Sequence, residues 1–445
     1  MTGQTGRVVS PVFDDTSSPP AIDDSGPSGL GPDPAALTLP FEPEARAQPG
    51  WGSRPSAETA RSGASIRGVL LHALLFAIVT RVALLVVAWM SVRILGKRAL
   101  YPVQLPDRFL PDTLILDGWA RWDTAHYVAV AQQGYGPDNP SHNGGLGFFP
   151  VFPLLMRGAT ELLGAAPSER NLALAALAIS NICFVGCVVL IAAIAARSSP
   201  DLARTTTVLF CLSPFAFFFN VAYTESLFLL LALGSLTLGE RRRPVLAAGL
   251  AAIASGTRLV GLALTPALLW SAWRRGATRR ELLTILLISP VGTVAYFGFT
   301  WARFDDPLAY FTAQSNWGGW DEHVWFYAEL FTRQPREALG GDPRHLVIVL
   351  NVALGLVALA LLPRMRRVVD PGLMMFTILL VVVQFAFTWV SLGRYLLPAA
   401  GLYLAGAALL TRPAWRGWPR DATLAVSTLL LGVLTALFSH GFWVV

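Results

Sequence analysis

Charged side chains are scarce in this sequence. Only 14% of its 445 residues are Asp, Glu, Lys or Arg, whereas 54% are hydrophobic, and the mean hydropathy is +0.53. Soluble globular domains are about 25% charged, so this balance excludes that class. Strand-like alternation of polar and apolar residues is also missing, and in lipid only helices and closed barrels satisfy every backbone polar group. The sequence therefore predicts an all-α, polytopic membrane protein.

Cysteines and short metal-ligand motifs are equally rare. The three cysteines, Cys183, Cys187 and Cys211, fall inside apolar runs and are predicted to be packing residues. No HExxH or CxxC pattern occurs, and a metal site assembled from scattered histidines such as His126, His142 and His323 is disfavoured. We expect neither a metal nor another cofactor.

The first 65 residues lack the apolar runs of the rest of the chain. They are dense in Pro, Gly, Ser and Asp and show no periodicity, which predicts a disordered cytosolic tail. No basic stretch is followed by a short apolar run, so a cleaved signal peptide is not expected. Residues 66–445 are predicted to form one transmembrane domain.

Apolar runs long enough to cross about 30 Å of hydrocarbon recur through that domain. They lie near 69–95, 171–196, 204–221, 224–239, 281–302, 345–362, 372–392, 395–411 and 422–443. Basic clusters between them mark the cytosolic side, at 197–204, 241–243, 273–280, 363–367 and 411–420. Since these clusters lie between spans, anionic lipid is the predicted partner and nucleic acid is not.

The topology follows from placing all these clusters in the cytosol. The chain must then turn back near SGTR, residues 255–258, either as two tilted crossings or as a re-entrant hairpin. About eleven crossings result, each needing roughly 20 residues, with the N-terminus inside and the C-terminus outside. The segments 96–170 and 303–343 become outer loops. Most of the acidic and histidine side chains that could take part in catalysis or binding lie in these two loops.

The first outer loop contains WARWDTAHYVAVAQ, residues 119–132. Its spacing predicts an amphipathic interfacial helix on which Asp123, His126 and Tyr127 share one face. A carboxylate beside an imidazole suits a general base, and Trp122 suits sugar stacking. A purely structural alternative is an interfacial helix with an aromatic belt.

A second stretch, residues 144–164, holds the sequence FFPVFP. Its glycines and prolines interrupt an aromatic run that is too short to span, and Phe149 and Pro150 lie at its centre. Such a stretch suits a re-entrant segment lining a cavity. A Pro-kinked connection into the next span is the alternative.

Arg258 and Arg394 lie at membrane depth, where a charge is costly without a partner. A lipid phosphate fits the guanidinium fork, whereas pairing with Glu225 or snorkelling would be purely structural. Glu225 follows Tyr223 and Thr224 at a sharp outer turn, where capping the next helix is the simplest role. The alternative is that Glu225 orients an arginine or a sugar hydroxyl. Arg81 faces either the same cavity or a helix neighbour.

The loop WGGWDEHVWFY, residues 317–327, combines tryptophans with acids and His323. Aromatic rings beside carboxylates suit carbohydrate contact. An interfacial helix resting on the bilayer would have the same composition.

The order of these segments is more specific than any one of them. RWDTAHYVAVAQQGYG, FFPVFPLLMR, SPFAFFFNVAYTESLFLLL and SGTRLVGL together resemble the PIG-V family, the GPI mannosyltransferase 2 group of the GT-C superfamily of membrane glycosyltransferases. The resemblance extends from about residue 117 to residue 262, with a weaker likeness to the end that includes GRYLLP.

This resemblance implies an inverting mannosyltransferase that uses a polyprenyl-phosphate mannose donor on the non-cytosolic side. Asp123 falls where such enzymes carry the catalytic base. The expected donor-phosphate ligands are Arg258, Arg394 and His126. Residues expected to line the substrate site are Trp122, Tyr127, Phe149, Pro150, Tyr223, Glu225 and His323.

The acceptor is less constrained than the donor. The composition is similar to that of a high-GC bacterium such as an actinobacterium, which favours a glycolipid, glycan or protein acceptor at the plasma membrane over a GPI precursor. A transporter of a lipid or lipid-linked sugar is the alternative function, because intramembrane arginines and broken helices also occur there. The sequence contains no second copy of the RWDTAH or FFPVFP segments, as an internal repeat would require.

Overall fold

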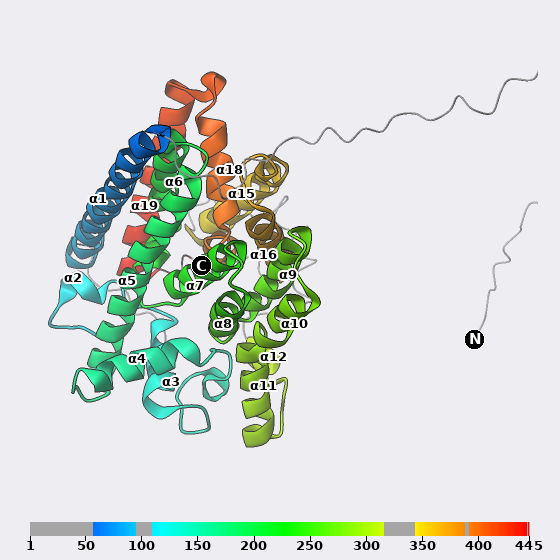
Figure 1. The fold of residues 1–445 in the computed structure, drawn as a ribbon. Coiled ribbons are helices and arrows are strands. Elements are labelled where there is room, and N and C mark those ends of the chain that lie inside the picture. Colours follow the sequence, from blue (N-terminus) through cyan, green and yellow to red (C-terminus); the bar gives the residue numbers. More distant parts are fainter. Residues whose placement is uncertain (1–56, 95–108, 316–342, 388–390, 443, 445) are drawn as a thin grey trace, which may run out of the picture. The chain divides into compact units, whose positions relative to one another are not determined.

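The computed structural model describes residues 57–94, 109–315, 343–387, 391–442 and 444 (Figure 1). Every regular element within these ranges is an α-helix or a 3-10 helix, and none is a strand. The predicted all-α class is therefore confirmed for the described part of the chain. His323 and the rest of the segment 317–327 lie outside the described residues.

Five helical stretches in these ranges are long and apolar enough to cross a membrane. They are α1 (Ala57–Ile94), α5 (Glu169–Ala196), the successive helices α10 (Arg279–Ile288) and α11 (Val291–Phe304), α15 (Pro343–Met365) and α19 (Trp418–His440). Shorter helices between them are α6 (Pro200–Leu212), α7 (Glu225–Glu240), α8 (Pro244–Ser255), α9 (Leu264–Arg274), α16 (Pro371–Phe387) and α18 (Ala400–Leu410). The chain is a multi-pass membrane protein, and the number and direction of its crossings stay predictions.

Several predicted boundaries are wrong. Helix α1 begins at Ala57, inside the predicted tail, of which residues 1–56 lie outside the described ranges. The predicted span 204–221 ends at Leu212, because Pro214 forces Ser213 into an extended conformation with ψ 139°. A short 3-10 helix, η2 (Ala216–Phe219), follows. The predicted span 281–302 corresponds to one membrane-long stretch, Arg279–Phe304, within which Pro290 separates α10 from α11.

The predicted break at residues 255–258 is confirmed. Helix α8 ends at Ser255, and the chain resumes as a 3-10 turn, η3 (Leu259–Ala263), that leads into α9. Ser255 accepts a hydrogen bond from the Thr293 backbone at its Oγ (3.3 Å) and one from Thr293 Oγ1 at its carbonyl (2.9 Å). Side chains of α11 thus satisfy backbone groups that the break frees.

Arg81 of α1 holds the turn after α6. Its guanidinium donates to the carbonyls of Ala216 (3.1 Å) and Cys211 (3.3 Å) and to Asn220 Oδ1 (2.5 Å). It also lies 4.1 Å from the centre of the Phe184 ring. Of the two roles left open by the sequence, the structure therefore supports that of a helix neighbour.

Replacing Arg81 by Met is expected to lower the thermal unfolding midpoint in detergent by several degrees. The change leaves buried acceptors without donors, and hydrogen bonds to a charged group contribute about 2 kcal/mol each. Arg204→Met is the matched control, since that exposed arginine on α6 pairs with Asp201, at 3.4 Å, and with no other acid among the described residues. Equal midpoints for the two variants would contradict the role of Arg81.

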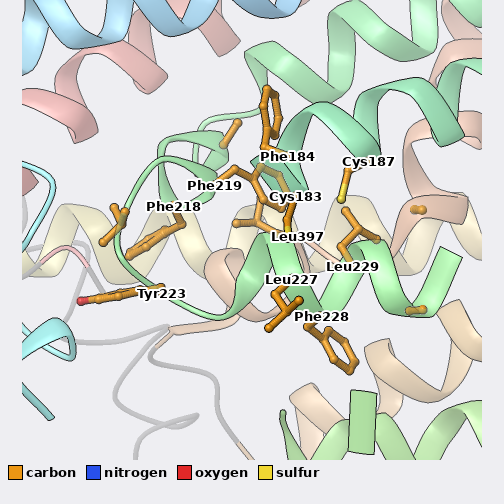
Figure 2. Packing of buried hydrophobic residues seen from close by; sticks show 14 of the residues in the cluster. Cys183, Phe184, Cys187, Phe218, Phe219, Tyr223, Leu227, Phe228, Leu229 and Leu397 are labelled. Carbon is orange, nitrogen blue, oxygen red and sulfur yellow. The ribbon is translucent and has the colours of Figure 1, made fainter. Parts of the chain in front are cut away.

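The core around α5 and α7 contains the cysteines. Figure 2 shows Cys183 and Cys187 among Phe184, Phe219 and Leu229. These two and Cys211 are buried free thiols. The prediction that the cysteines are packing residues is confirmed.

Candidate functional site

The segment before Asp123 is a turn, not a helix. Helix α2 (Leu114–Asp117) ends six residues before Asp123, and α3 (Thr124–Gln133) begins directly after it. The start predicted for this helix, at residue 119, is therefore wrong. The cause is Trp122, whose φ of 52° is left-handed and cannot continue a right-handed helix. Asp123 consequently sits at the N-terminus of α3 and makes no side-chain capping bond.

Helix α3 is packed against the rest of the protein, and its predicted position at the membrane interface stays a prediction. It lies against α4 (Val151–Leu162) and α5, and Tyr127, Val128 and Val130 are buried. The Tyr127 ring meets Phe152 edge-on, with centroids 5.2 Å apart.

His126 and Tyr127 also share Phe148 as a neighbour. The His126 ring stacks on Phe148 with centroids 4.7 Å apart, and Tyr127 meets the same ring edge-on at 5.0 Å. Burial and, secondarily, the charges of Glu225 and Asp123 raise the pKa of Tyr127 above its ordinary value. The phenol therefore stays neutral and is unsuited to act as a base. A phosphate-binding role for His126 stays a prediction.

Asp123, Arg394, Glu225 and Arg258 form a chain of alternating charge. Arg394 Nη1 lies 2.7 Å from Asp123 Oδ2, and Arg394 Nε lies 2.6 Å from Glu225 Oε1. Arg258 Nη1 lies 2.9 Å from the same Glu225 oxygen. Opposite charges at these distances offset the cost of removing each from water.

This cluster joins segments that are far apart in the sequence. Glu225 opens α7, Arg258 follows the break after α8, and Arg394 lies on α17 (Leu392–Tyr395). Gly393 permits the approach of α17, because a Cβ there would collide with the ring of Phe215. Its N–H also donates to Asn351 Oδ1.

Aromatic rings surround the two guanidinium groups. The Arg394 guanidinium carbon lies 4.3 Å from the centre of the Tyr223 ring and 5.1 Å from that of Phe218. Tyr395 lies beside both cations, 5.0 Å from Arg258 and 5.5 Å from Arg394. Cation–π contacts of this kind fix a guanidinium without consuming its N–H donors.

Exposure differs sharply along the charged chain. The side chain of Glu225 is 0% exposed and that of Arg394 is 5%, whereas Arg258 is 12% and Asp123 is 30% exposed. Asp123 is therefore the member most open to another molecule. The second oxygen of Glu225, Oε2, is buried and has no hydrogen-bond partner among the described residues.

The predicted roles of Glu225 divide accordingly. Thr224 makes no side-chain cap bond to α7; its hydroxyl instead lies 3.3 Å from Arg258 Nη1 and 3.4 Å from Tyr127 Oη. Glu225 pairs with both arginines, so the alternative that it orients an arginine is the one that the structure supports. Its side chain is fully buried, and its substrate-lining role stays a prediction.

Phe149 and Pro150 lie beside the break in the chain. The first residue of α4, Val151, donates its N–H to the carbonyl of Gly256 (3.2 Å). Phe149 is buried against Tyr296 and Tyr310, with ring centroids 4.8 Å and 5.1 Å away. Their substrate-lining role, like that of Trp122, stays a prediction.

Within the described ranges, no group of three or more His, Cys, Asp or Glu side chains could hold a metal ion. Since His323 is not among these residues, the expectation of a metal-free site stays open.

Sequence reasoning missed the buried pair formed by Asp117 and Arg121. Arg121 Nη2 lies 2.7 Å from Asp117 Oδ2, and the two side chains are 3% and 0% exposed. The spacing of four residues was a usable signal. It was obscured because acid and base at that spacing usually lie on an exposed helix face.

A family model described as mannosyltransferase (PIG-V) matches residues 67–275. The match covers slightly less than half of the chain, and over these residues the chain is similar to that family. The matched range includes Asp123, Glu225 and Arg258 but ends before Arg394.

Similar curated proteins carry the name GPI alpha-1,6-mannosyltransferase 2. The rat protein is 35% identical over 173 residues, covering 36% of this chain and 33% of the relative. The human protein is 34% identical over 161 residues, covering 33% and 30%. The match thus spans about a third of each relative.

Solved structures of two membrane proteins resemble the fold distantly. The oligosaccharyltransferase of Archaeoglobus fulgidus, crystallised with Zn and sulfate, has a TM-score of 0.43 at 14% identity and covers 81% of this chain and 53% of its own. ArnT from Cupriavidus metallidurans has a TM-score of 0.43 at 16% identity. The alignment covers 82% of this chain and 76% of the ArnT chain.

Proposed function

We propose that the chain is an inverting glycosyltransferase that moves mannose from a polyprenyl-phosphate donor to a glycolipid, glycan or protein acceptor at the outer face of the plasma membrane. The observation that carries the proposal is the ion pair of Asp123 and Arg394. It places a partly exposed carboxylate next to a cation whose other N–H groups have no hydrogen-bond acceptor among the described residues. The similarity of residues 67–275 to a mannosyltransferase family supports the same reaction class.

The proposed reaction is a single displacement. Asp123 takes the proton of the acceptor hydroxyl while that oxygen bonds to the anomeric carbon. The bond from this carbon to the phosphate oxygen breaks on the opposite face, which inverts the configuration. The products are the mannosylated acceptor, polyprenyl phosphate and protonated Asp123.

The leaving phosphate is a stable anion, so the step needs no general acid. The larger need is stabilisation of the negative charge that develops on it. Arg394 donates hydrogen bonds from Nε and Nη1 to carboxylates, and Arg258 donates one from Nη1 to Glu225. The remaining N–H groups of each five-donor fork can donate hydrogen bonds to phosphate oxygens.

The same geometry explains how the base becomes available. In the structure Asp123 is held by Arg394 at 2.7 Å, where its lone pair is engaged. A donor phosphate competes for this guanidinium and releases the carboxylate toward the acceptor. Donor binding before acceptor binding follows from the proposal.

The purified chain in lipid vesicles is expected to consume polyprenyl-phosphate mannose and to release polyprenyl phosphate in equal amount when a membrane-lipid extract supplies acceptors. GDP-mannose is expected to give no product. Arg394→Gln should slow transfer by about a hundredfold, in the range for loss of one donor to a developing anion. Labelled mannose in donor and product reports all three results.

Arg157→Gln is the matched control, because this arginine makes an exposed pair with Glu161 on α4. It should transfer at the wild-type rate. If the wild-type protein moves the lipid-linked sugar across the vesicle membrane without making product, the chain is a transporter and the proposal is wrong.

A further inference from the structure

We infer that Tyr223 and the buried ion pair Asp117–Arg121 are positioning residues, which hold the backbone turn that orients the Asp123 carboxylate. This inference rests on the proposed function. The starting point is the strained turn that carries Asp123. Trp122 has φ 52°, a left-handed conformation that bulky residues rarely adopt. Such strain persists only where the surroundings impose it.

The Tyr223 hydroxyl holds Trp122 in this left-handed conformation through two hydrogen bonds to the main chain. It accepts a hydrogen bond from the Asp123 backbone N–H (3.1 Å) and donates one to the Arg121 carbonyl (3.2 Å). One oxygen therefore joins the residues on either side of Trp122 and closes the turn. The group needed here must both donate and accept, which a phenol does and a phenyl ring cannot.

The other end of the turn is fixed by Arg121. Its Nη2 pairs with Asp117 Oδ2 (2.7 Å), and its Nε donates to the carbonyl of Ser439 near the end of α19 (3.3 Å). Asp117 Oδ1 accepts from the Leu110 N–H (3.2 Å). Both charges are buried, so the pair carries a desolvation cost that surface charges avoid. It anchors the carbonyl that the Tyr223 hydroxyl requires.

Tyr223 is itself held rigidly. Its side chain is fully buried, and its carbonyl accepts from Ser180 Oγ (2.9 Å). The ring lies 4.3 Å from the Arg394 guanidinium, the ion-pair partner of Asp123. One side chain thus sets the main chain of the proposed base and the position of its cation. The substrate-lining role predicted for Tyr223 stays a prediction.

Tyr223→Phe separates the two contacts, because it removes the hydroxyl and keeps the ring under Arg394. The turnover number should fall by about tenfold to a hundredfold, the effect of misplacing a reacting group by about 1 Å. KM for the lipid-linked donor should stay within about threefold, since the phosphate contacts remain. The assay is mannose transfer by the full chain in vesicles.

A double variant distinguishes positioning from a general structural role. If the hydroxyl acts through the Asp123 carboxylate, adding Tyr223→Phe to Asp123→Asn should cost no further residual activity. An equal loss in both backgrounds would mean that the hydroxyl stabilises the fold only, and would overturn the inference.

Substitutions of Trp122 test the backbone without the hydroxyl. Trp122→Gly and Trp122→Ala both lose the indole, but only Gly adopts φ 52° without strain. The Gly variant should turn over several-fold faster than the Ala variant. An Ala variant as fast as the Gly variant would contradict the need for the left-handed turn.

The two levels of the proposal fail in different ways. Wild-type activity for Tyr223→Phe, together with an inactive Asp123→Asn, overturns the positioning role and leaves the proposed function intact. Absence of transfer by the wild-type protein overturns the proposed function and the positioning role with it.

Discussion

Replacing Asp123 by Asn is expected to lower the turnover number for mannose transfer by about a thousandfold, within the usual range for loss of general-base catalysis. The amide keeps the shape of the carboxylate but cannot take up the acceptor proton. Donor binding should survive, because Arg258 and Arg394 are unchanged. The loss should therefore appear in kcat while KM for the donor changes little.

The fold should tolerate this change. Asp123 is 30% exposed, and Arg394 keeps Glu225 as a partner at 2.6 Å. A partly exposed ion pair contributes about 1 kcal/mol or less, so the unfolding midpoint should shift little. Turnover and thermal unfolding measured on the same preparation separate catalysis from stability.

Asp138→Asn is the matched control, since Asp138 is an exposed acid in the same segment between α1 and α5. It should transfer at the wild-type rate. Turnover by Asp123→Asn within tenfold of this control would exclude Asp123 as the base.

The helical framework was largely predictable, because lipid imposes long apolar runs on any spanning helix. The break at residues 255–258 followed from charge placement alone. Boundaries near Pro214 and Pro290 were missed because hydropathy does not detect a single residue that ends a helix. These prolines were visible in the sequence, and the rule for the residue before proline predicts the first of the two ends.

The members of the site were predictable, but their arrangement was not. Asp123 and Arg394 are 271 residues apart, and no local periodicity reports such a contact. Pairing of each arginine with Glu225 was considered as an alternative to phosphate binding. The structure shows that one oxygen of Glu225 serves both arginines, which leaves each with donors to spare.

The turn at Trp122 was hidden for a different reason. The residues from Trp119 to Gln132 fit a helical period, and no glycine marks a left-handed position. Tertiary contacts from Tyr223 and Arg121 override that local preference. Tyr395 was missed because its role depends on two arginines that converge only in the folded chain.

Removing the charge of Glu225 is expected to have the largest effect on stability. In Glu225→Gln, the buried guanidinium of Arg258 loses its carboxylate partner, and Arg394 keeps only Asp123. Breaking a buried ion pair from one side costs about 3–5 kcal/mol. A large drop in the thermal unfolding midpoint and in the yield of folded protein should result.

Charge balance, and not the loss of one hydrogen bond, should be the cause. Adding Arg258→Gln to Glu225→Gln removes the unpaired cation and should restore part of the midpoint, while transfer stays lost. Glu161→Gln is the control, because its pair with Arg157 is exposed on both sides. If Glu225→Gln unfolded at the temperature of this control, the arginines would not depend on Glu225.

The same variant tests whether the arginines attract the donor anion. With Glu225 neutral, the site carries two cations against the single carboxylate of Asp123, so a phosphate should bind it more tightly. A ligand that binds only the folded state raises the free energy of unfolding, and at a given ligand concentration the increase is larger when the ligand binds more tightly. Polyprenyl phosphate should therefore raise the unfolding midpoint of Glu225→Gln more than that of the wild-type protein. An equal rise in both, or none in either, would remove Arg258 and Arg394 from the phosphate site and leave them as structural partners of Glu225.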